Sequence, residues 1–524
     1  MKKKKHTETD NLAITPPTND TGANEEAPTA ARMPAQNKAA IAFDILDKLP
    51  RFKSPTGRKF VVIDGAAVSL RRSEPVREFV SAEYHRITNA TISESAIEEA
   101  VLAISGQPLE TREAHVRVGG TADRIVVDLV TDNKTAIIRP EGVTVERADV
   151  PFARPPGTAS LVVPEVSALN ATDAAGAFQD FYNLLGIDDV YTRASIGAFI
   201  VQAMRPRGPF AMLIVRGVQG SGKTTVTRQI RRLLDPREPE DVEVPHNTRF
   251  LAIHAEHSHL LAYDNLSTLD QRLSDAFCRI ATGSGFVTRA LRTDRDLAAF
   301  RSSRPIVFTS IGDVGVAPDL LDRALIVTLP GRKDRKPETH LDAQFDALRP
   351  RLLAAVLYAV HVALQGMSKV AVPGEIRMMD AACFAVAAEP VLGLPPGSIV
   401  KAFLASRAEA AVTTATDSVV ARTLDVLETR NPWTGSLEEL LDALHGSSGS
   451  SRSRAVKDLP NNARALRARL DRVAGALRHL DVTMDFSQLH ATRRTRIVVL
   501  KRAGAKHTNG HGNGTGRPLT KKIA

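Results

Sequence analysis

The stretch PFAMLIVRGVQGSGKTT, residues 209–225, decides the fold of this chain. Its first half, PFAMLIVR, is a short apolar run, which predicts a strand that is buried on both faces of a sheet. Its second half follows the spacing G-x-x-x-x-G-K-T, and the RQIRRLL that comes soon after predicts a helix. A strand, a glycine-rich loop and a helix in this order predict a loop that binds phosphate groups.

Each residue type in this loop has a chemical reason. The glycines let successive backbone N–H groups face one anion, and the helix places its positive end at the phosphates. Lys223 is expected to reach the β and γ phosphates, and the Thr224 hydroxyl to ligate Mg²⁺. We therefore predict ATP and Mg²⁺ as cofactors. The predicted nucleotide-binding residues of the loop are Gly217, Gly220, Ser221, Gly222, Lys223, Thr224 and Thr225.

Two later strands are expected to end beside the same loop. HLLAY, followed by Asp264, predicts the strand whose carboxylate holds the metal opposite Thr224. The next residue is the amide Asn265, where a second acid is often found, so the group that holds the attacking water is an open question. Asn265 is the first candidate, since a glutamine orients the water in GTPases. Thr309, near the end of PIVFTS, is the second, although a hydroxyl there is also typical of a turn.

PDLLDRALIVTLP, residues 318–330, places Arg323 directly before a further predicted strand. An arginine so placed can reach the γ-phosphate bound by a neighbouring subunit and stabilise charge there. The alternative is a surface ion pair with Asp319 or Asp322, which is common at the ends of elements. The predicted catalytic residues are Lys223, Asp264, Asn265, Thr309 and Arg323, with Thr224 and Asp264 as the metal ligands.

Composition is that of an ordinary globular protein. Of its residues, 43% are hydrophobic and 24% charged. Its length of 524 residues is enough for roughly three to four domains. Its two cysteines have no metal-ligand spacing, which argues against a disulfide framework or zinc site and fits a reducing compartment such as the cytoplasm. MKKKKHTETDNL lacks the apolar stretch of a secretory signal, and LLAAVLYAVHVAL is shorter than a membrane span, so we expect a buried helix and no membrane partner.

The pattern of elements predicts an α/β core between smaller domains. ESAIEEAVLAIS predicts a helix, RIVVDLV and TAIIRP predict two strands, and residues 338–413 predict consecutive helices. The expected organisation is a disordered tail (1–38), a small α+β domain (39–150), a Pro-rich linker (151–164), a phosphate-loop ATPase core (165–335), a helical lid (336–415), a winged-helix-like basic domain (416–502) and a disordered basic tail (503–524).

The C-terminal end carries the positive charge. Residues 451–524 hold 17 Lys or Arg against 4 Asp, and 17 − 4 gives +13, whereas the whole chain has +10. The order helix, helix, long basic helix and hairpin predicts a winged helix-turn-helix, whose third helix enters the major groove. We favour DNA as its partner, with a protein–protein module as the alternative. The DNA-binding candidates are Arg464 and Arg467 on the third helix and Arg493, Arg494 and Arg496 on the wing.

LLAYDNLSTLDQRLSDAFCRIATGSGFVTRALRTDRD, RPIVFTSIGDV and PDLLDRALIVTLP resemble phage and mobile-element ATP-binding proteins related to the primase-helicases of helicase superfamily 3, within the AAA+ class. The resemblance covers roughly residues 165–400 and is most specific in ATGSGFVTRAL. It implies a P-loop ATPase fold and a homo-oligomeric ring that acts on DNA, alongside replication partner proteins. Primase activity does not carry over, because the N-terminal region shows no paired carboxylates for a two-metal polymerase.

The resemblance also assigns roles to single residues. ATGSGFVTRAL corresponds to a hairpin in the ring channel, which implies that Arg289 and Arg292 hold the DNA backbone; nucleotide sensing by Arg289 is the alternative. Arg377, in GEIRMMDAA, corresponds to a lid arginine that touches bound nucleotide. The chain departs from its relatives at Thr309-Ser310, where they tend to have Asn-Gly, although a hydrogen-bonding side chain is kept.

Three functions fit these features. The leading one is an ATP-dependent DNA motor or remodeller in phage or mobile-element replication. The second is a regulatory switch, in which ATP sets the assembly state and the C-terminal domain binds DNA without unwinding it. The third is a nucleotide-binding protein that loads another enzyme onto DNA.

Overall fold

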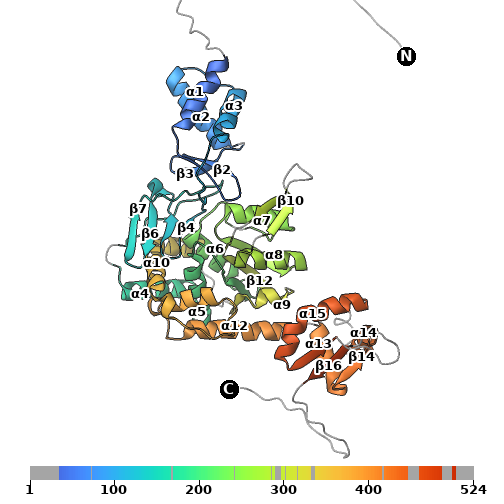
Figure 1. The fold of residues 1–524 in the computed structure, drawn as a ribbon. Coiled ribbons are helices and arrows are strands. Elements are labelled where there is room, and N and C mark those ends of the chain that lie inside the picture. The colour runs from blue at the N-terminus through green and yellow to red at the C-terminus, as the bar shows by residue number, and fades with distance from the viewer. Residues whose placement is uncertain are drawn as a thin grey trace, which may run out of the picture. The chain divides into compact units, whose positions relative to one another are not determined.

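The computed structural model describes residues 35–71, 73–166, 169–240, 242–284, 286–289, 297–300, 303–315, 317–331, 337–415, 418–446, 459–486 and 498–502. The chain divides into two compact units, residues 1–49 with 73–108 and residues 50–72 with 109–524. The stretch 39–150, expected to form one small domain, is therefore shared between the two units. Its predicted helix and its two predicted strands are present (Figure 1).

The first unit is helical. Its elements are α1 (Ala35–Asp47), α2 (Glu74–Thr88) and α3 (Glu94–Ser105). Ser93 and Gly106 flank α3, and Val80, Tyr84 and Ile104 are fully buried. Arg77 of α2 pairs with Glu94 of α3 at 2.9 Å. These contacts close a small hydrophobic core within the unit.

The second unit begins with two small antiparallel sheets. The first has the order β1-β2-β3 and the second β4-β5-β6-β7. Their strands are β1 (Arg51–Lys53), β2 (Lys59–Ile63), β3 (Ala66–Ser69), β4 (Val118–Gly120), β5 (Ile125–Asp128), β6 (Thr135–Arg139) and β7 (Gly142–Glu146). A short 3-10 turn at Thr131–Asn133 joins β5 to β6, so the two predicted strands form a hairpin.

A four-stranded parallel sheet in the order β13-β8-β12-β9 is the centre of the unit. Its strands are β8 (Met212–Gly217), β9 (Leu261–Thr268), β12 (Ile306–Gly315) and β13 (Ala324–Leu329). Each begins in one of the apolar runs identified in the sequence. The chain is thus of mixed α/β class with a parallel sheet, as predicted.

The side chains of the sheet alternate between two cores. Leu213 and Val215 of β8 face a cluster with Val226 and Ile230 of the following helix α6. Met212 and Ile214 face the opposite cluster, which contains Tyr263, Phe277 and Phe308. Because both faces are covered, the strands read as continuous apolar runs. The same alternation fixes which face each residue at the strand ends can reach.

Helices cover the sheet and continue after it (Figure 1). Those of the core are α4 (Ala171–Leu184), α5 (Val190–Ala203), α6 (Lys223–Leu234), α7 (Thr248–His257), α8 (Gln271–Thr282) and α9 (Pro318–Leu321). A hairpin of β10 (Phe286–Arg289) and β11 (Leu297–Phe300) follows α8. The helices after the sheet are α10 (Glu338–Gly366), α11 (Met379–Ala388) and α12 (Ser398–Ala415), with 3-10 turns at Met367–Lys369 and Glu389–Val391.

Helix α10 is longer than the apolar run from Leu352 predicted, because it continues through Pro350 from an N-terminal part rich in charged residues. Among the described residues, the stretch 338–369 is the single one long and apolar enough to cross a membrane, and half of its most apolar window is buried inside the protein. Its residues Leu352, Leu353 and Val356 are fully buried in the main core. Here it serves as a core helix, as expected.

The C-terminal part comprises α13 (Ser418–Thr429), β14 (Trp433–Gly435), α14 (Leu437–Gly446), α15 (Ala463–His479), β15 (Val482–Asp485) and β16 (Val498–Arg502). Its sheet has the order β14-β16-β15. The three helices and the hairpin follow the predicted order. Strand β14 was not predicted, because a three-residue segment that follows Pro432 and ends at Gly435 has the composition of a turn.

A buried polar network lies where the antiparallel sheet meets the parallel one. Arg117 pairs with Asp235 at 3.0 Å, and both side chains are fully buried. The other oxygen of Asp235 accepts the backbone N–H of His259 at 2.9 Å. The Nε2 of His259 lies 2.6 Å from the carbonyl oxygen of Ala203, so Nε2 carries a proton and donates it to that oxygen.

We expect this histidine to make the fold sensitive to acid. Burial, helped by the charge of Arg304, lowers the pKa of His259 to about 4. In the unfolded chain the pKa is near the usual value of about 6.5, so the unfolded state binds a proton first as the pH falls. The free energy of unfolding should drop by about 3 kcal/mol between pH 6.5 and 4.

The measurement is the midpoint of thermal unfolding over this pH range, for the wild type and for His259→Gln. The variant should lose most of the slope between pH 6.5 and 5. Burial raises the pKa of Asp235 but the nearby Arg117, His259 and Arg237 outweigh it, and the net lowering places its effect below this window. Equal slopes in the two proteins would contradict the prediction.

Candidate nucleotide site

The glycine-rich loop joins β8 to α6 at the carboxyl end of the sheet. Gly222 has φ +91° and stands directly before the first residue of α6, a backbone conformation that favours glycine. A Cβ at Gly217 would lie 2.7 Å from the carbonyl oxygen of Leu329. The loop therefore packs against β13 so closely that a side chain at Gly217 is excluded.

Lys223 lies at the start of α6 and is nearly buried, with 8% of its surface exposed. Its Nζ donates to the carbonyl oxygens of Gly217 at 2.8 Å and Val218 at 3.0 Å. Burial lowers the pKa of Lys223, and the negative charge of Asp264 opposes that shift. The ammonium group is thus held inside the loop, on the same side of the sheet as Asp264.

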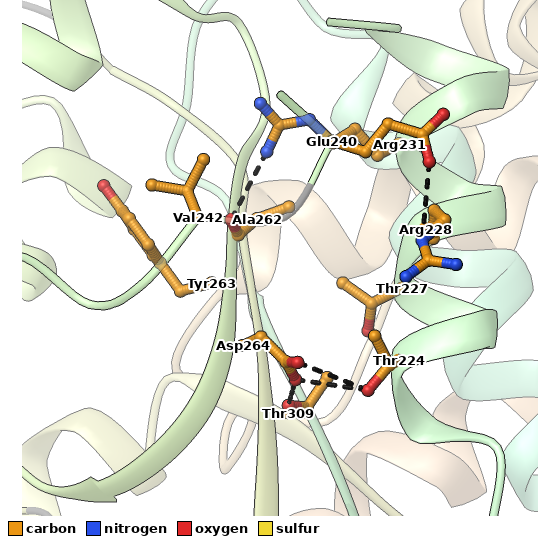
Figure 2. Close-up of a pocket in the computed structure, with 10 residues that line it drawn as sticks. All are labelled: Thr224, Thr227, Arg228, Arg231, Glu240, Val242, Ala262, Tyr263, Asp264 and Thr309. Carbon is orange, nitrogen blue, oxygen red and sulfur yellow. Dashed lines mark hydrogen bonds and ion pairs between the residues drawn. The ribbon is translucent and has the colours of Figure 1, made fainter. Parts of the chain in front are cut away.

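Asp264 lies opposite the loop, at the point where β9 passes the first turn of α6. Its two oxygens lie 3.4 and 3.3 Å from the Thr224 hydroxyl, and it accepts a hydrogen bond from the Thr309 hydroxyl (Figure 2). These three residues come from α6, β9 and β12, and the parallel sheet brings them together. Ser221 is buried in the same loop, and Thr225 lies in the first turn of α6.

Asn265 has a backbone reason to be an amide. Its φ is +57°, and asparagine is among the few residues that adopt this left-handed region readily. Its backbone N–H donates to the Thr309 hydroxyl at 2.9 Å and lies 3.0 Å from an Asp264 oxygen. A glutamate here would be more strained than asparagine, so the backbone at this position favours the amide over a glutamate. The Thr309 hydroxyl accepts from Asn265 and donates to Asp264.

The donors at this point fit Mg²⁺. One carboxylate and one hydroxyl face each other across 3.3 to 3.4 Å, and Mg²⁺ prefers oxygen ligands, typically one or two protein groups together with substrate phosphates. Thr224 and Asp264 are the residues that would hold it. The described residues contain no cluster of three or more His, Cys, Asp or Glu side chains.

A groove runs from Asp264 along the space between α6 and β9. Arg228, Arg231 and Glu240 line it together with Thr227 (Figure 2). Glu240 pairs with Arg228 at 3.4 Å and also with Arg232. Arg232 pairs further with Asp342 of α10 at 2.9 Å. This network ties the helix that follows the loop to the helices that follow the sheet.

Arg323 and Arg377 lie at the amino end of the parallel strands, whereas the loop lies at their carboxyl end. The carbonyl of Arg323 accepts the N–H of Met212, the first residue of β8, whereas the loop begins at Gly217, the last one. Five strand steps separate these residues, or about 17 Å. Arg323 pairs with Asp319, and Arg377 pairs with Asp319 at 3.2 Å and Asp322 at 3.0 Å. Arg377 therefore lies beside Arg323, and the nucleotide contact expected of it stays a prediction.

The structure describes some of the predicted DNA-binding arginines but not all of them. Arg289 ends strand β10 of a hairpin, as the resemblance implied, but its side chain and Arg292 lie outside the described residues. Arg493, Arg494 and Arg496 also lie outside them. Arg464 is exposed on α15. Arg467 stacks on Phe486 with 3.3 Å to the ring centre and pairs with Asp471 at 2.9 Å, so its charge is partly neutralised within the domain.

One segment beside the site was missed in the sequence. Val242–Val244 runs alongside β9, with a parallel bridge between Glu243 and Asp264. The alternation Val-Glu-Val is a short strand signal, but it is too brief to stand out from its polar surroundings.

The comparisons with known proteins bear on the same region. The family model of the actinomycete integrative conjugative element replication protein matches residues 181–408, and that of the AICE RepA C-terminal domain matches residues 419–513. The chain thus matches a family of mobile-element replication proteins. No curated protein gives a significant match.

Two solved structures match most of the chain at low identity. One is titled SCCmec type IV Cch, active helicase, with 12% identity and a TM-score of 0.44, covering 86% of this chain and 92% of that one. The other is the apo structure of the NrS-1 C-terminal region, with 9% identity and a TM-score of 0.36, covering 88% of this chain and 99% of that one.

Proposed function

We propose that this protein binds and hydrolyses ATP and uses it to move or remodel DNA during replication of a mobile element. In this proposal residues 165–335 form a P-loop ATPase core of the AAA+, superfamily 3 helicase-like type, residues 336–415 a lid, and residues 416–502 a winged-helix DNA-binding domain. The observation that carries it is the Asp264 carboxylate 3.3 Å from the Thr224 hydroxyl, across from a buried Lys223. The family match supports the setting in mobile-element replication.

The roles of single residues follow from their positions. Gly217, Gly220, Ser221, Gly222 and Thr225 would shape the loop around the phosphates, and Lys223 would neutralise charge on the β and γ groups. Mg²⁺ would supply further positive charge between these phosphates when bound. Thr309 would hold Asp264 in place, because its hydroxyl donates to that carboxylate.

Strand displacement from a forked duplex, with and without ATP, tests the proposal. Unwinding that requires ATP and is lost in Lys223→Ala would support a motor. Tight duplex binding without DNA-stimulated phosphate release would instead favour the alternative, an ATP-gated regulatory switch or loader. The contacts between Thr224 and Asp264 support a site for ATP and Mg²⁺, which the motor and the switch would share, so this experiment is what separates the two.

The basic C-terminal domain predicts a strong salt dependence of DNA binding. Arg493, Arg494 and Arg496 are proposed to contact phosphates, and each such contact adds about 0.9 to the slope of log K against log salt on duplex DNA. Replacing all three by alanine should therefore reduce the slope by about 2 to 3.

Fluorescence anisotropy titrations between low and physiological salt measure this slope. Arg86→Ala is the matched control, because Arg86 forms a largely exposed pair with Glu83 on α2 and does not belong to the C-terminal domain. The control should change the slope by less than about 0.9, which is the contribution of one phosphate contact. If the triple variant keeps the wild-type slope, the DNA contact lies in the central domain instead.

A further inference from the structure

The proposed site has no acid directly after Asp264, although a water molecule that attacks the γ-phosphate needs a group to take its proton. We propose that Glu243 is the general base, supplied from the segment beside β9 rather than from β9 itself. The proposal rests on the proposed ATPase function and names a residue for its chemical step.

The register places Glu243 next to Asp264. The N–H of Asp264 donates to the carbonyl oxygen of Val242 at 3.1 Å, and Glu243 and Asp264 form a parallel bridge. The backbones of neighbouring strands lie about 4.8 Å apart, and bridge partners point to the same face. The two carboxylates are therefore side by side at the carboxyl end of the sheet, where the loop lies.

The packing of the flanking valines gives the same orientation independently. Val242 and Val244 pack against the cluster that contains Tyr263 and Phe308. Asp264 points to the other face, since its oxygens lie 3.3 to 3.4 Å from Thr224 of α6. Side chains alternate along an extended segment, so Glu243, between the two valines, points to the face of Thr224.

Glu243 is also available, whereas the other groups near the site are engaged. Its side chain is exposed, and it enters no hydrogen bond or ion pair with another described residue. Thr309 donates its hydroxyl proton to Asp264. Glu240 pairs with both Arg228 and Arg232. Asn265 has no proton-accepting carboxylate. Among the described residues beside Asp264, Glu243 alone combines a carboxylate with freedom to approach the γ-phosphate.

The chemical step balances with this residue as base. The water oxygen forms a bond to the γ-phosphorus, and the bond between that phosphorus and the β–γ bridging oxygen breaks. The bridging oxygen leaves with the electron pair as part of ADP. Glu243 accepts the proton that the water loses and returns it to solvent. General base catalysis of this kind contributes about 100- to 10,000-fold to a rate.

Glu243→Gln in the full-length chain tests the proposal, because glutamine keeps the size of the side chain and removes its basicity. Steady-state phosphate release is measured with DNA present. ATP affinity is measured separately by equilibrium binding of a fluorescent ATP analogue. Recovery of intact ATP with the protein after gel filtration gives a third readout. Glu256→Gln is the matched control, since Glu256 makes only a partly exposed pair with Arg58.

We expect Glu243→Gln to lower turnover at least about 100-fold, with ATP affinity within about twofold and intact ATP retained on the protein. Glu256→Gln should match the wild type. The proposal is overturned if Glu243→Gln keeps turnover within about threefold of the wild type, or if its ATP affinity falls in parallel with turnover, as a structural role would require. It is also overturned if Asn265→Gly shows the loss instead.

Failure of the proposed function looks different. In that case the wild type itself releases no phosphate with DNA, and Glu243→Gln cannot retain more intact ATP than the wild type. Lys223→Ala, which should weaken ATP binding, separates the two cases by showing whether the loop binds nucleotide at all. Absence of wild-type turnover would overturn both proposals.

Discussion

Replacement of Asp264 by asparagine is expected to lower ATP turnover about a thousandfold, which corresponds to about 4 kcal/mol of transition-state stabilisation. Asparagine keeps the size of the side chain and one oxygen, so it can still accept the hydrogen bonds from the Thr309 hydroxyl and the Asn265 N–H. What it loses is the negative charge 3.3 Å from the Thr224 hydroxyl. The variant should therefore lose metal-dependent ATP turnover and keep its thermal stability.

Three measurements separate these effects. Phosphate release with DNA reports turnover, ATP binding with and without Mg²⁺ reports the metal contribution, and thermal unfolding reports the fold. Asp275→Asn is the matched control, because Asp275 is exposed and bonded only to Gln271 among the described residues, at 2.7 Å. Turnover of Asp264→Asn within tenfold of the wild type, or ATP binding that Mg²⁺ improves equally in both proteins, would show that another group holds the metal.

The central sheet was predictable because its signals are local. Continuous apolar runs predict strands that are buried on both faces. The glycine spacing after β8 predicts a phosphate-binding loop between that strand and the next helix. The meeting of Thr224, Asp264 and Thr309 then follows from topology, since the carboxyl ends of parallel strands lie at one edge of a sheet. The structure brings these three together as the sequence predicted.

The remaining features depend on contacts that the sequence does not show locally. Asn265 has a left-handed backbone conformation between Asp264 and Leu266. This conformation explains why asparagine is favoured there, and the pattern of apolar residues along a strand does not indicate it. The pairing of Val242–Val244 with β9 joins residues about 20 positions apart by a three-residue segment, shorter than a typical strand. A short segment of this kind gains its geometry from the neighbouring strand, so propensity alone does not identify it.

The location of Arg323 relative to the phosphate loop could have been predicted from the sheet topology. A residue directly before a parallel strand lies at the amino end of the sheet, whereas the phosphate loop lies at the carboxyl end. Arg323 was predicted either to serve a neighbouring subunit or to form an ion pair, and the structure shows the ion pair with Asp319. The same edge holds Arg377. The phosphate loop lies about 17 Å along the strand from Arg323, so we expect a catalytic role for Arg323 to involve a second subunit.

That requirement makes Arg323→Ala the second decisive variant. If subunits of a ring share each site, the loop comes from one chain and Arg323 from the next, a heterologous interface. An arginine supplied in trans contributes about 1,000- to 100,000-fold to phosphoryl transfer, so we expect turnover to fall at least about a thousandfold while each chain still binds ATP. Loss of the ion pair alone would cost little, because Asp319 is about half exposed.

Mixing two inactive variants tests the shared site directly. Arg323→Ala has an intact loop and Lys223→Ala has an intact Arg323, so mixed rings contain sites with both groups. In equal mixtures about one quarter of the sites should be complete, and turnover should recover toward that fraction. Asp319→Asn is the control, because it breaks the ion pair and leaves the arginine, so it should stay close to the wild type. If the mixture stays inactive, or if Asp319→Asn loses as much activity as Arg323→Ala, Arg323 acts within its own chain through the ion pair.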